Sequence, residues 1–326
     1  MSNINIEKLA QLANVSIGTV SKAFSGSKEI SEKTRNKIFA LAKKHDCFEK
    51  YYKAKREKKV VAVICPELKS PYYVDIVSRI EKLLNDKKVI MALYISNFEA
   101  KKETEIISYL LSSKTVDGII IIASNTLVKF NKDVAIVAVN TKRENSQVDC
   151  VNVAFKDTFI QTIKYLKDCG HKKIAFIGEG LTKSRLTFFD NAMKENGLMV
   201  NPNWIFIEKE RFEQAGISAI EKIFALSNKP TAILCAYDNI ALGAMQAIKQ
   251  HGKSVPDDFS IVGVDDIPVS SHVNVGLTTI KSNNATICEI AVDLVLKKIE
   301  SKFFSLREKI SLKTELVIRD TVKKIN

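Results

Sequence analysis

The sequence predicts an α/β protein in which a small all-α module precedes two lobes built on doubly wound parallel sheets. Short amphipathic helical patterns fill the start of the chain, and from Val60 onward brief apolar runs alternate with helical segments. The 326 residues are enough for two or three domains. We expect a helical headpiece over 1–46, a basic linker over 47–59 and a two-lobed domain over 60–326.

Each of the three helices expected in the headpiece has a start signal and an apolar face. Asn5, Ser16 and Ser31 are residue types that cap a helix, because their side chains accept a hydrogen bond from a backbone N–H one turn later. Only Asn14 and Val15 separate the first two helices, which predicts a helix-turn-helix. The positions at helical spacing that we expect to be buried are Ile6, Leu9, Ala10, Ala13, Val20, Phe24, Ile38, Leu41 and Ala42.

The stretch NVSIGTVSKAF, residues 14–24, predicts a helix that faces a partner rather than its own core. The second helix of a helix-turn-helix lies in the DNA major groove. There the Lys22 ammonium can donate to guanine O6 and N7, Ile17 can contact a thymine methyl, and Gly18 lets the backbone approach closely. The hydroxyls of Thr19 and Ser21 can reach phosphates. Double-stranded DNA is therefore the predicted partner, and a three-helix module that binds protein is the alternative.

Charge is concentrated at the same end of the chain. Residues 1–60 carry 14 Lys or Arg and 6 Asp or Glu, a net charge of +8, out of +13 for the whole protein. A basic end of this kind favours a polyanionic partner, although a lysine-rich surface without function gives the same numbers.

Several classes of protein are disfavoured by what the sequence lacks. The apolar runs are too short for a membrane span, and the N-terminus has no signal-peptide pattern, so we expect a cytoplasmic protein. The six cysteines have no CxxC spacing and the four histidines are scattered, so we expect no metal site and no disulfide. There is no P-loop, no complete GxGxxG and no GxSxG, and we expect neither a cofactor nor catalytic residues.

Continuous apolar strands that alternate with helices indicate parallel sheets covered on both faces. The expected strands are VVAVIC (60–65), VIMALYI (89–95), GIIIIA (118–123), VAIVAV (134–139), KIAFIG (173–178), TAILCA (231–236) and SIVGVD (260–265). The expected helices between them cover 73–84, 102–111, 159–166 and 240–249.

Residues 6–45 resemble the headpiece of LacI/GalR-type transcription regulators, above all in the V-S-x-x-T-V-S-K core. The rest of the chain resembles the effector domain of the same family, which shares its fold with periplasmic sugar-binding proteins. The matching pieces occur in the family's order: KSPYYVDIVSRIE, VDGIII, CGHKKIAFIG, PTAILCAYDNIALGAMQAI, VPDDFSIVGVDDIP, LTTI and ELVIRDT.

The resemblance implies a homodimer that binds a near-palindromic operator, most commonly as a repressor, and a small effector, for instance a sugar, bound between the lobes. The DNA-binding residues that we assign are Asn5, Ser16, Ile17, Gly18, Thr19, Ser21, Lys22 and Arg56. The effector-binding residues that the family pattern implies are Tyr72, Tyr73, Asn140, Arg185, Asp238 and Asp265.

Two departures from the family pattern matter. An Asp-Asn pair is replaced by Ala154 and Phe155, and Asn140 stands where an aspartate is common, so the effector is expected to be less hydroxylated than a standard sugar. The linker lacks the usual leucine wedge and has Arg56 at that position. Arginine enters a narrow minor groove but does not prise bases apart, so we expect less DNA bending.

Two other functions stay open at this point. One is a ligand-sensing module whose headpiece has degraded or non-specific DNA binding. The other is an enzyme on the same two-lobed architecture, which the missing phosphate loops and acid/base pairs disfavour.

Overall fold

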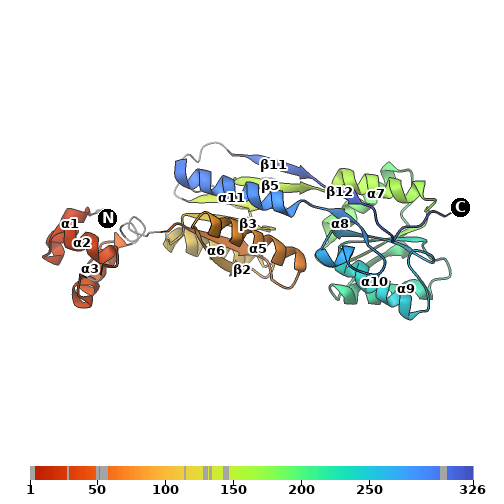
Figure 1. Ribbon diagram of the computed structural model, residues 1–326, viewed down its shortest axis with the longest axis horizontal. Coiled ribbons are helices and arrows are strands. Elements are labelled where there is room, and N and C mark those ends of the chain that lie inside the picture. Colours follow the sequence, from red (N-terminus) through yellow and green to blue (C-terminus); the bar gives the residue numbers. More distant parts are fainter. Residues whose placement is uncertain are drawn as a thin grey trace. The chain divides into compact units, whose positions relative to one another are not determined.

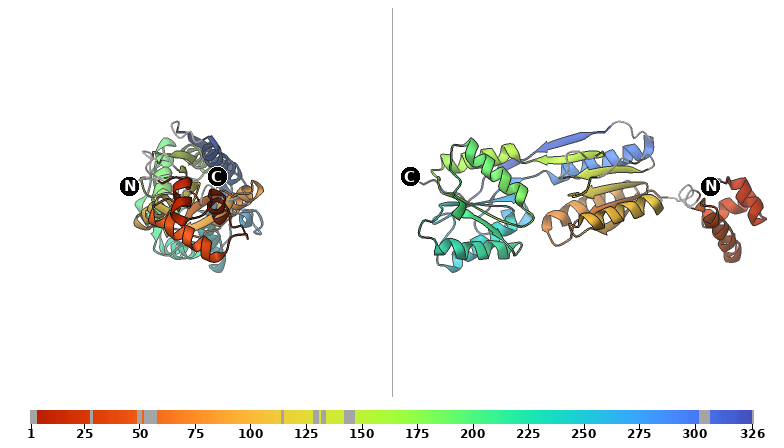
Figure 2. Two further views of the ribbon diagram at one scale, coloured as in Figure 1. Left: turned by 90° about the vertical axis from the view of Figure 1, so that its left-hand side faces the viewer. Right: turned by 180° about the vertical axis from the view of Figure 1, so that it is seen from behind.

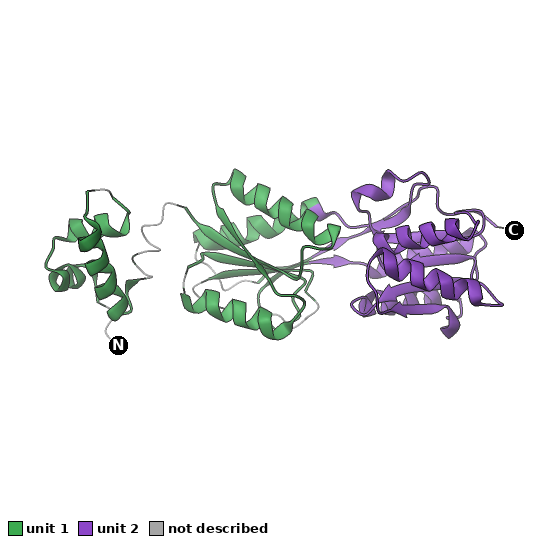
Figure 3. Cartoon of the chain, turned by 90° about the horizontal axis from the view of Figure 1, so that it is seen from below, with its two compact units in different colours: residues 1–151, 285–310 green, residues 152–284, 311–326 purple. Residues whose placement is uncertain are grey.

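The structure is a computed structural model. It describes residues 4–27, 29–48, 51, 58–113, 115–127, 131, 134–141, 147–301 and 307–325. The chain divides into two compact units, which Figure 3 shows in different colours. Unit 1 comprises residues 1–151 and 285–310, unit 2 comprises residues 152–284 and 311–326, and the chain therefore passes between them three times. Arg56 lies outside the described residues.

Within the described residues the headpiece contains the three expected helices, and their expected caps are confirmed. Asn5 Oδ1 accepts from the Lys8 N–H at 2.9 Å, and the Ser16 and Ser31 hydroxyls accept from backbone N–H groups three residues later. All the expected core positions are buried except Ile6 and Leu41, which are half-buried. The helices are α1 (Ile6–Ala13), α2 (Ile17–Phe24) and α3 (Glu32–Lys44).

The packed headpiece continues past the boundary expected at residue 46. Cys47 is fully buried, and Phe48 and Tyr51 pack on the same cluster. The Phe48 ring contacts Phe24 at 5.6 Å between centroids, and the Tyr51 hydroxyl donates to the Ile4 carbonyl at 3.0 Å. The linker expected over 47–59 therefore begins too early, because its first residues complete the aromatic core of the headpiece.

The rest of unit 1 is a six-stranded sheet in the order β11-β5-β4-β3-β1-β2. The β1, β2, β3, β4 and β5 pairs are parallel. Side chains of α6 pack on one face of the sheet. On the other face α11 lies close to β3, since a Cβ at Gly118 would meet Val295 and Ile299. The elements are β1 (Val60–Cys65), α5 (Pro71–Asp86), β2 (Ile90–Ile95), α6 (Ala100–Ser113), β3 (Gly118–Ile122), β4 (Ala135–Val139), β5 (Asp149–Ala154), α11 (Asn284–Ser301) and β11 (Lys309–Lys313).

Unit 2 is a second six-stranded sheet in the order β12-β10-β9-β8-β6-β7, with β12 antiparallel to β10 and the other pairs parallel. Helices α7 and α8 flank one side and α9 and α10 the other (Figures 1 and 2). The α9–α10 contact is backbone-close at Gly216 and Gly243. The elements are α7 (Lys156–Asp168), β6 (Ile174–Glu179), α8 (Lys183–Glu195), η1 (Pro202–Trp204), β7 (Ile205–Glu208), α9 (Glu213–Ala225), β8 (Ala232–Cys235), α10 (Asp238–Gln250), β9 (Ser260–Asp265), η2 (Pro268–Ser271), β10 (Thr278–Lys281) and β12 (Glu315–Val317).

The predicted α/β class with parallel sheets and a helical headpiece is confirmed. Within the described ranges, no helix has the length and hydropathy needed to cross a membrane. In the same ranges, no three His, Cys, Asp or Glu side chains gather as a metal site.

Candidate functional site

Helix α2 has a small surface of exposed residues, and hydrogen bonds within the helix hold its first turn in place. Ser16, Gly18 and Lys22 are exposed, and Ile17 has 47% of its surface accessible. The Ser16 hydroxyl accepts from the Thr19 N–H at 3.0 Å and lies 2.9 Å from the Thr19 hydroxyl. The capping bonds fix the first turn of α2, so its outward residues have a defined direction.

The other residues assigned to DNA binding in the headpiece, together with Lys22, also form hydrogen bonds or ion pairs within the headpiece. Ser21 is half-buried, and its carbonyl accepts from the Ser25 N–H at 3.1 Å. Lys22 lies in the last turn of α2, and its ammonium forms an ion pair with Glu29. Asn5 caps α1.

In unit 1, the predicted effector residues lie at the carboxyl ends of parallel strands. Tyr72 and Tyr73 begin α5 after β1, and Asn140 follows β4 with a left-handed φ of 51°. The Asn140 amide donates to the Tyr72 hydroxyl at 2.6 Å. The Tyr72 and Tyr73 rings meet edge-on, and Phe98, which follows β2, packs against Tyr73. The structure therefore brings all three predicted residues of this unit together and adds Phe98.

A buried carboxylate supports the same end of the unit 1 sheet. Glu103 of α6 is 1% exposed, and both the Ser124 and the Thr126 hydroxyls donate to its Oε1 at 2.5 Å. Its oxygens also accept from the Asn125 and Thr126 N–H groups, at 3.4 and 3.3 Å. Glu103 thus fixes the loop after β3.

In unit 2, the buried Asp265 forms an ion pair with the half-buried Arg185. Arg185 of α8 donates to the two Asp265 oxygens at 2.7 and 3.4 Å, and it also donates to the Ala236 carbonyl. Its guanidinium lies 5.4 Å from the centroid of the Phe155 ring. Burial raises the pKa of Asp265, and the Arg185 charge opposes that shift. The pair offers a ligand a planar cation and a carboxylate beside an aromatic face.

Asp238 has a different place from the one implied by the family pattern. It is fully buried at the start of α10 and accepts hydrogen bonds from the Ile267 N–H at 2.9 Å and from the Ser270 and Thr279 hydroxyls at 2.7 and 2.5 Å. Burial raises its pKa to about 7, against the effect of these hydrogen bonds. Because its oxygens are used inside unit 2, Asp238 holds the segment after β9 in place and is not exposed to a ligand.

A second polar cluster at the strand ends of unit 2 was missed by the sequence interpretation. Glu179 ends β6 and is 3% exposed, and its carboxylate accepts from the Leu181 N–H at 2.8 Å. Arg211 Nε and the Tyr237 hydroxyl each lie 3.5 Å from Glu179 Oε1. The Tyr237 hydroxyl also accepts from the Phe212 N–H at 3.0 Å, and Phe212 has φ 57° and ψ −139°. A non-glycine residue in that region is strained, which is common at ligand-binding positions.

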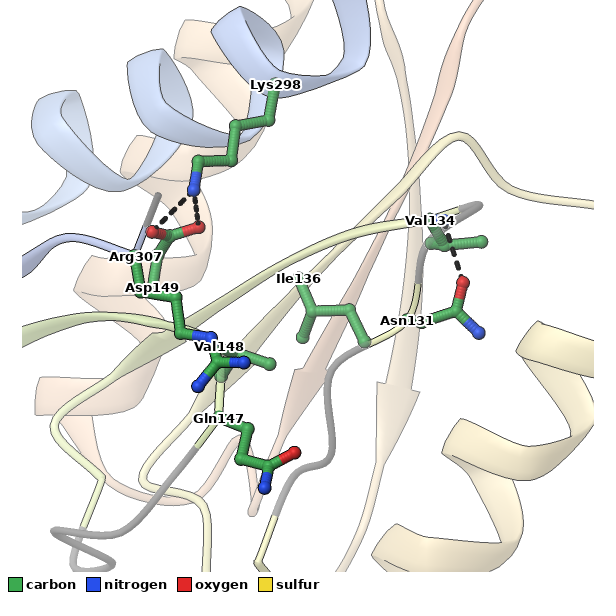
Figure 4. Close-up of a pocket in the computed structure, with 8 residues that line it drawn as sticks. All are labelled: Asn131, Val134, Ile136, Gln147, Val148, Asp149, Lys298 and Arg307. Atoms are coloured by element: carbon green, nitrogen blue, oxygen red, sulfur yellow. Dashed lines mark hydrogen bonds and ion pairs between the residues drawn. The ribbon is translucent and has the colours of Figure 1, made fainter. Parts of the chain in front are cut away.

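Two pockets of unit 1 lie away from these strand ends. One is small, with about 10 Å³ of room, which is close to the need of a single water molecule. Figure 4 shows its residues, among them Lys298, whose ammonium contacts both Asp149 oxygens at 2.7 and 2.6 Å. The other is a wide groove along α11, and its lining residues include Lys58, Val89 and Ile310. Asp149 and Lys58 precede or begin strands, so both pockets lie at the amino ends of the sheet.

Comparison with known proteins assigns both parts of the chain to described families. The model of the lacI family of bacterial regulatory proteins matches residues 5–47, and a periplasmic binding protein-like domain matches residues 163–322. The HTH-type transcriptional repressor PurR of Histophilus somni (strain 129Pt) is 31% identical over 339 residues, covering 98% of each protein. The ribose operon repressor of Haemophilus influenzae is 28% identical over 331 residues, covering 97% of this chain and 98% of the relative.

Solved structures show the same fold. The lac repressor dimer bound to operator and an anti-inducer has a TM-score of 0.72 at 22% identity, covering 99% of this chain and 100% of that one. A LacI family regulator from Enterococcus faecium with bound ribose has a TM-score of 0.71 at 20% identity, covering 82% of this chain and 100% of that one. The chain therefore belongs to the lacI family of bacterial regulatory proteins, with a helix-turn-helix headpiece joined to a periplasmic-binding-protein-like domain.

Proposed function

We propose that this protein is a cytoplasmic, non-enzymatic repressor that binds a near-palindromic operator as a homodimer and changes its operator affinity when a small ligand binds. The observation that carries the proposal is the exposed surface of α2, where Ile17, Gly18 and Lys22 stand outward on a capped helix. A two-fold symmetric pair of such helices matches a palindromic site. The relatives named as repressors support the direction of regulation.

The proposed DNA contacts divide into two kinds. Lys22 and Ile17 read base edges, and Gly18 allows the backbone of α2 to approach the groove. Asn5, Ser16, Thr19 and Ser21 position the helix on phosphates, with Arg56 following in the linker. These four short polar side chains hold register without reading the sequence.

The proposed effector is a small metabolite with one flat apolar face and few hydroxyls. Tyr72, Tyr73 and Asn140 offer aromatic faces and an amide in unit 1. Arg185 and Asp265 offer the charged pair in unit 2, with Phe155 against the guanidinium. Aromatic faces with a few placed polar groups suit a ring-shaped ligand, either a sugar with few hydroxyls or a planar heterocycle. Asp238 takes no direct part and positions the segment that follows Asp265.

The test is enrichment of random duplex DNA on the full-length protein at low and at near-physiological salt. We expect a palindromic motif that survives the higher salt, because base contacts are less salt-dependent than phosphate contacts. Lys22→Ala should flatten the preference at one position of each half-site. Binding that disappears with salt and yields no motif would contradict the proposal and favour a ligand-sensing module without specific DNA binding.

A further inference from the structure

Lys22, which we assign to reading a base, has a charged partner on the headpiece itself. The Lys22 ammonium forms an ion pair with the carboxylate of Glu29, which lies in the segment between α2 and α3. Both side chains remain accessible, at 50% for Lys22 and 68% for Glu29. A carboxylate in contact with Lys22 must lie at the same surface of the headpiece as the lysine itself.

The segment that carries Glu29 is anchored from both helices. The Ser27 N–H donates to the Lys22 carbonyl at 3.2 Å, and Arg35 of α3 donates to the Ser27 carbonyl at 2.6 Å. The Glu29 N–H in turn lies 3.3 Å from the Ser27 hydroxyl, and the Ile30 N–H lies 3.4 Å from the Ser27 carbonyl. The backbone of Glu29 is therefore fixed relative to α2, and the ion pair follows from the fold.

The carboxylate of Glu29, placed beside Lys22, is expected to weaken DNA binding. Phosphates repel the carboxylate, and the carboxylate competes with every acceptor on the DNA for the Lys22 ammonium. An exposed ion pair is weak in water, so a good partner can replace it. In the major groove, guanine O6 and N7 form such a partner because no other base presents two adjacent acceptors there.

We propose that Glu29 is a specificity-determining residue that holds Lys22 in an ion pair and releases it only to the matching base. This rests on the proposed function, in which α2 enters the major groove. Glu29 lowers affinity for all DNA and lowers it most for non-matching DNA. Part of the discrimination between the operator and other sequences therefore comes from Glu29, which weakens binding to non-matching DNA.

The experiment compares full-length wild type with Glu29→Gln, using the enriched duplex and a scrambled duplex of the same length. Asp46→Asn is the matched control, because it removes one exposed headpiece carboxylate at a left-handed position that asparagine tolerates. For Glu29→Gln we expect about a five-fold gain in affinity for the scrambled duplex and a smaller gain for the target. The slope of log K against log salt on scrambled DNA should steepen by about 0.9, as for one more cation available to phosphates. Asp46→Asn should leave the ratio of the two affinities at its wild-type value.

A second pair of variants tests whether Glu29 acts through Lys22. In the Lys22→Gln background, Glu29→Gln should no longer change the base preference of the enriched motif. If Glu29→Gln alone leaves the target-to-scrambled ratio at the wild-type value, or if its effect is the same with and without Lys22, the inference is overturned while the proposed function stands. If wild type enriches no motif at either salt concentration, both are overturned.

Discussion

The headpiece and the strand ends of unit 2 handle polar side chains in opposite ways. On α2 the polar side chains are exposed or half-buried and have local partners: the Ser16 hydroxyl accepts from the Thr19 N–H, and Lys22 pairs with the exposed Glu29. In unit 2, Arg185 and Asp265 are mostly buried and satisfy each other. A DNA surface has to offer donors to an outside partner, whereas a buried charge without a partner is costly. Substitutions in the headpiece should therefore change binding more than stability, and substitutions at the strand ends of unit 2 should do the reverse.

The largest effect is expected from Arg185→Ala. It leaves the Asp265 carboxylate buried without its counter-ion, and removing one partner of such a pair costs about 3 kcal/mol or more. Urea unfolding followed by the fluorescence of Trp204, the single tryptophan and part of the unit 2 core, reports the stability of this unit. Lys164→Ala is the control, because the Lys164–Asp168 pair is exposed and should cost about 0.5 kcal/mol or less. Equal losses in the two variants would contradict the contrast between buried and exposed pairs.

The next largest effect is a pH dependence of the free energy of unfolding that arises from Asp238. Burial raises the pKa of Asp238 to about 7 from an ordinary 3.8, so between these values the folded protein binds a proton that the unfolded chain has released. Stability from this group is present at low pH and is lost as the pH rises through about 7. Relative to Asp238→Asn, wild type should lose about 2 kcal/mol between pH 5 and pH 6.5 and change little above pH 8. Parallel unfolding curves for the two proteins across this range would show that Asp238 is already ionised at pH 5.

The contrast also explains which features could be predicted from the sequence. In the headpiece, a cap and its donor are three residues apart, and apolar positions repeat within one helix, so α1, α2 and α3 follow from local patterns. The boundary at residue 46 was wrong because Phe48 and Tyr51 look like the start of a charged linker. Only their packing against Phe24, which is far away in sequence, places them in the headpiece.

The strands of the lobes that could be predicted are continuous apolar runs, most of them buried; the edge strand β2 was predicted from its apolar run although it has exposed and half-buried positions. Strands β1, β3, β4 and β9 are continuous apolar runs with buried interiors. The edge strands β7 and β11 are short, at four and five residues, and were not predicted, although the polar/apolar alternation of β11 (KISLK) is a strand signal. Glu179, Arg211 and Tyr237 meet only because three strand ends are adjacent, and each is an ordinary polar residue in its own segment.

A moderate effect is expected at two helix caps that have the same geometry. The Ser16 and Ser31 hydroxyls accept from the N–H groups of Thr19 and Thr34 at 3.0 and 3.2 Å, and both lie 2.9 Å from the threonine hydroxyl. Ser16→Ala and Ser31→Ala should each cost about 1 kcal/mol, measured by amide hydrogen exchange of the helix that each one caps. Only Ser16→Ala should also weaken operator binding, because its hydroxyl lies on the surface proposed to face phosphates. A comparable loss of affinity in Ser31→Ala would mean that cap stability alone explains the effect.

The smallest effect is expected from Gly18→Ala, which should change helix stability and operator affinity in opposite directions. A Cβ at Gly18 would meet only the Ser16 hydroxyl, at an ordinary 3.6 Å, so packing within the headpiece does not require glycine there. Gly18→Ala should slow hydrogen exchange in α2, since alanine stabilises a helix relative to glycine by about 0.5 kcal/mol. If the backbone of α2 approaches DNA at Gly18, the same variant should bind the operator more weakly although it is more stable. An affinity that is unchanged or higher would show that Gly18 does not lie in the contact, and would move the proposed DNA surface toward Lys22.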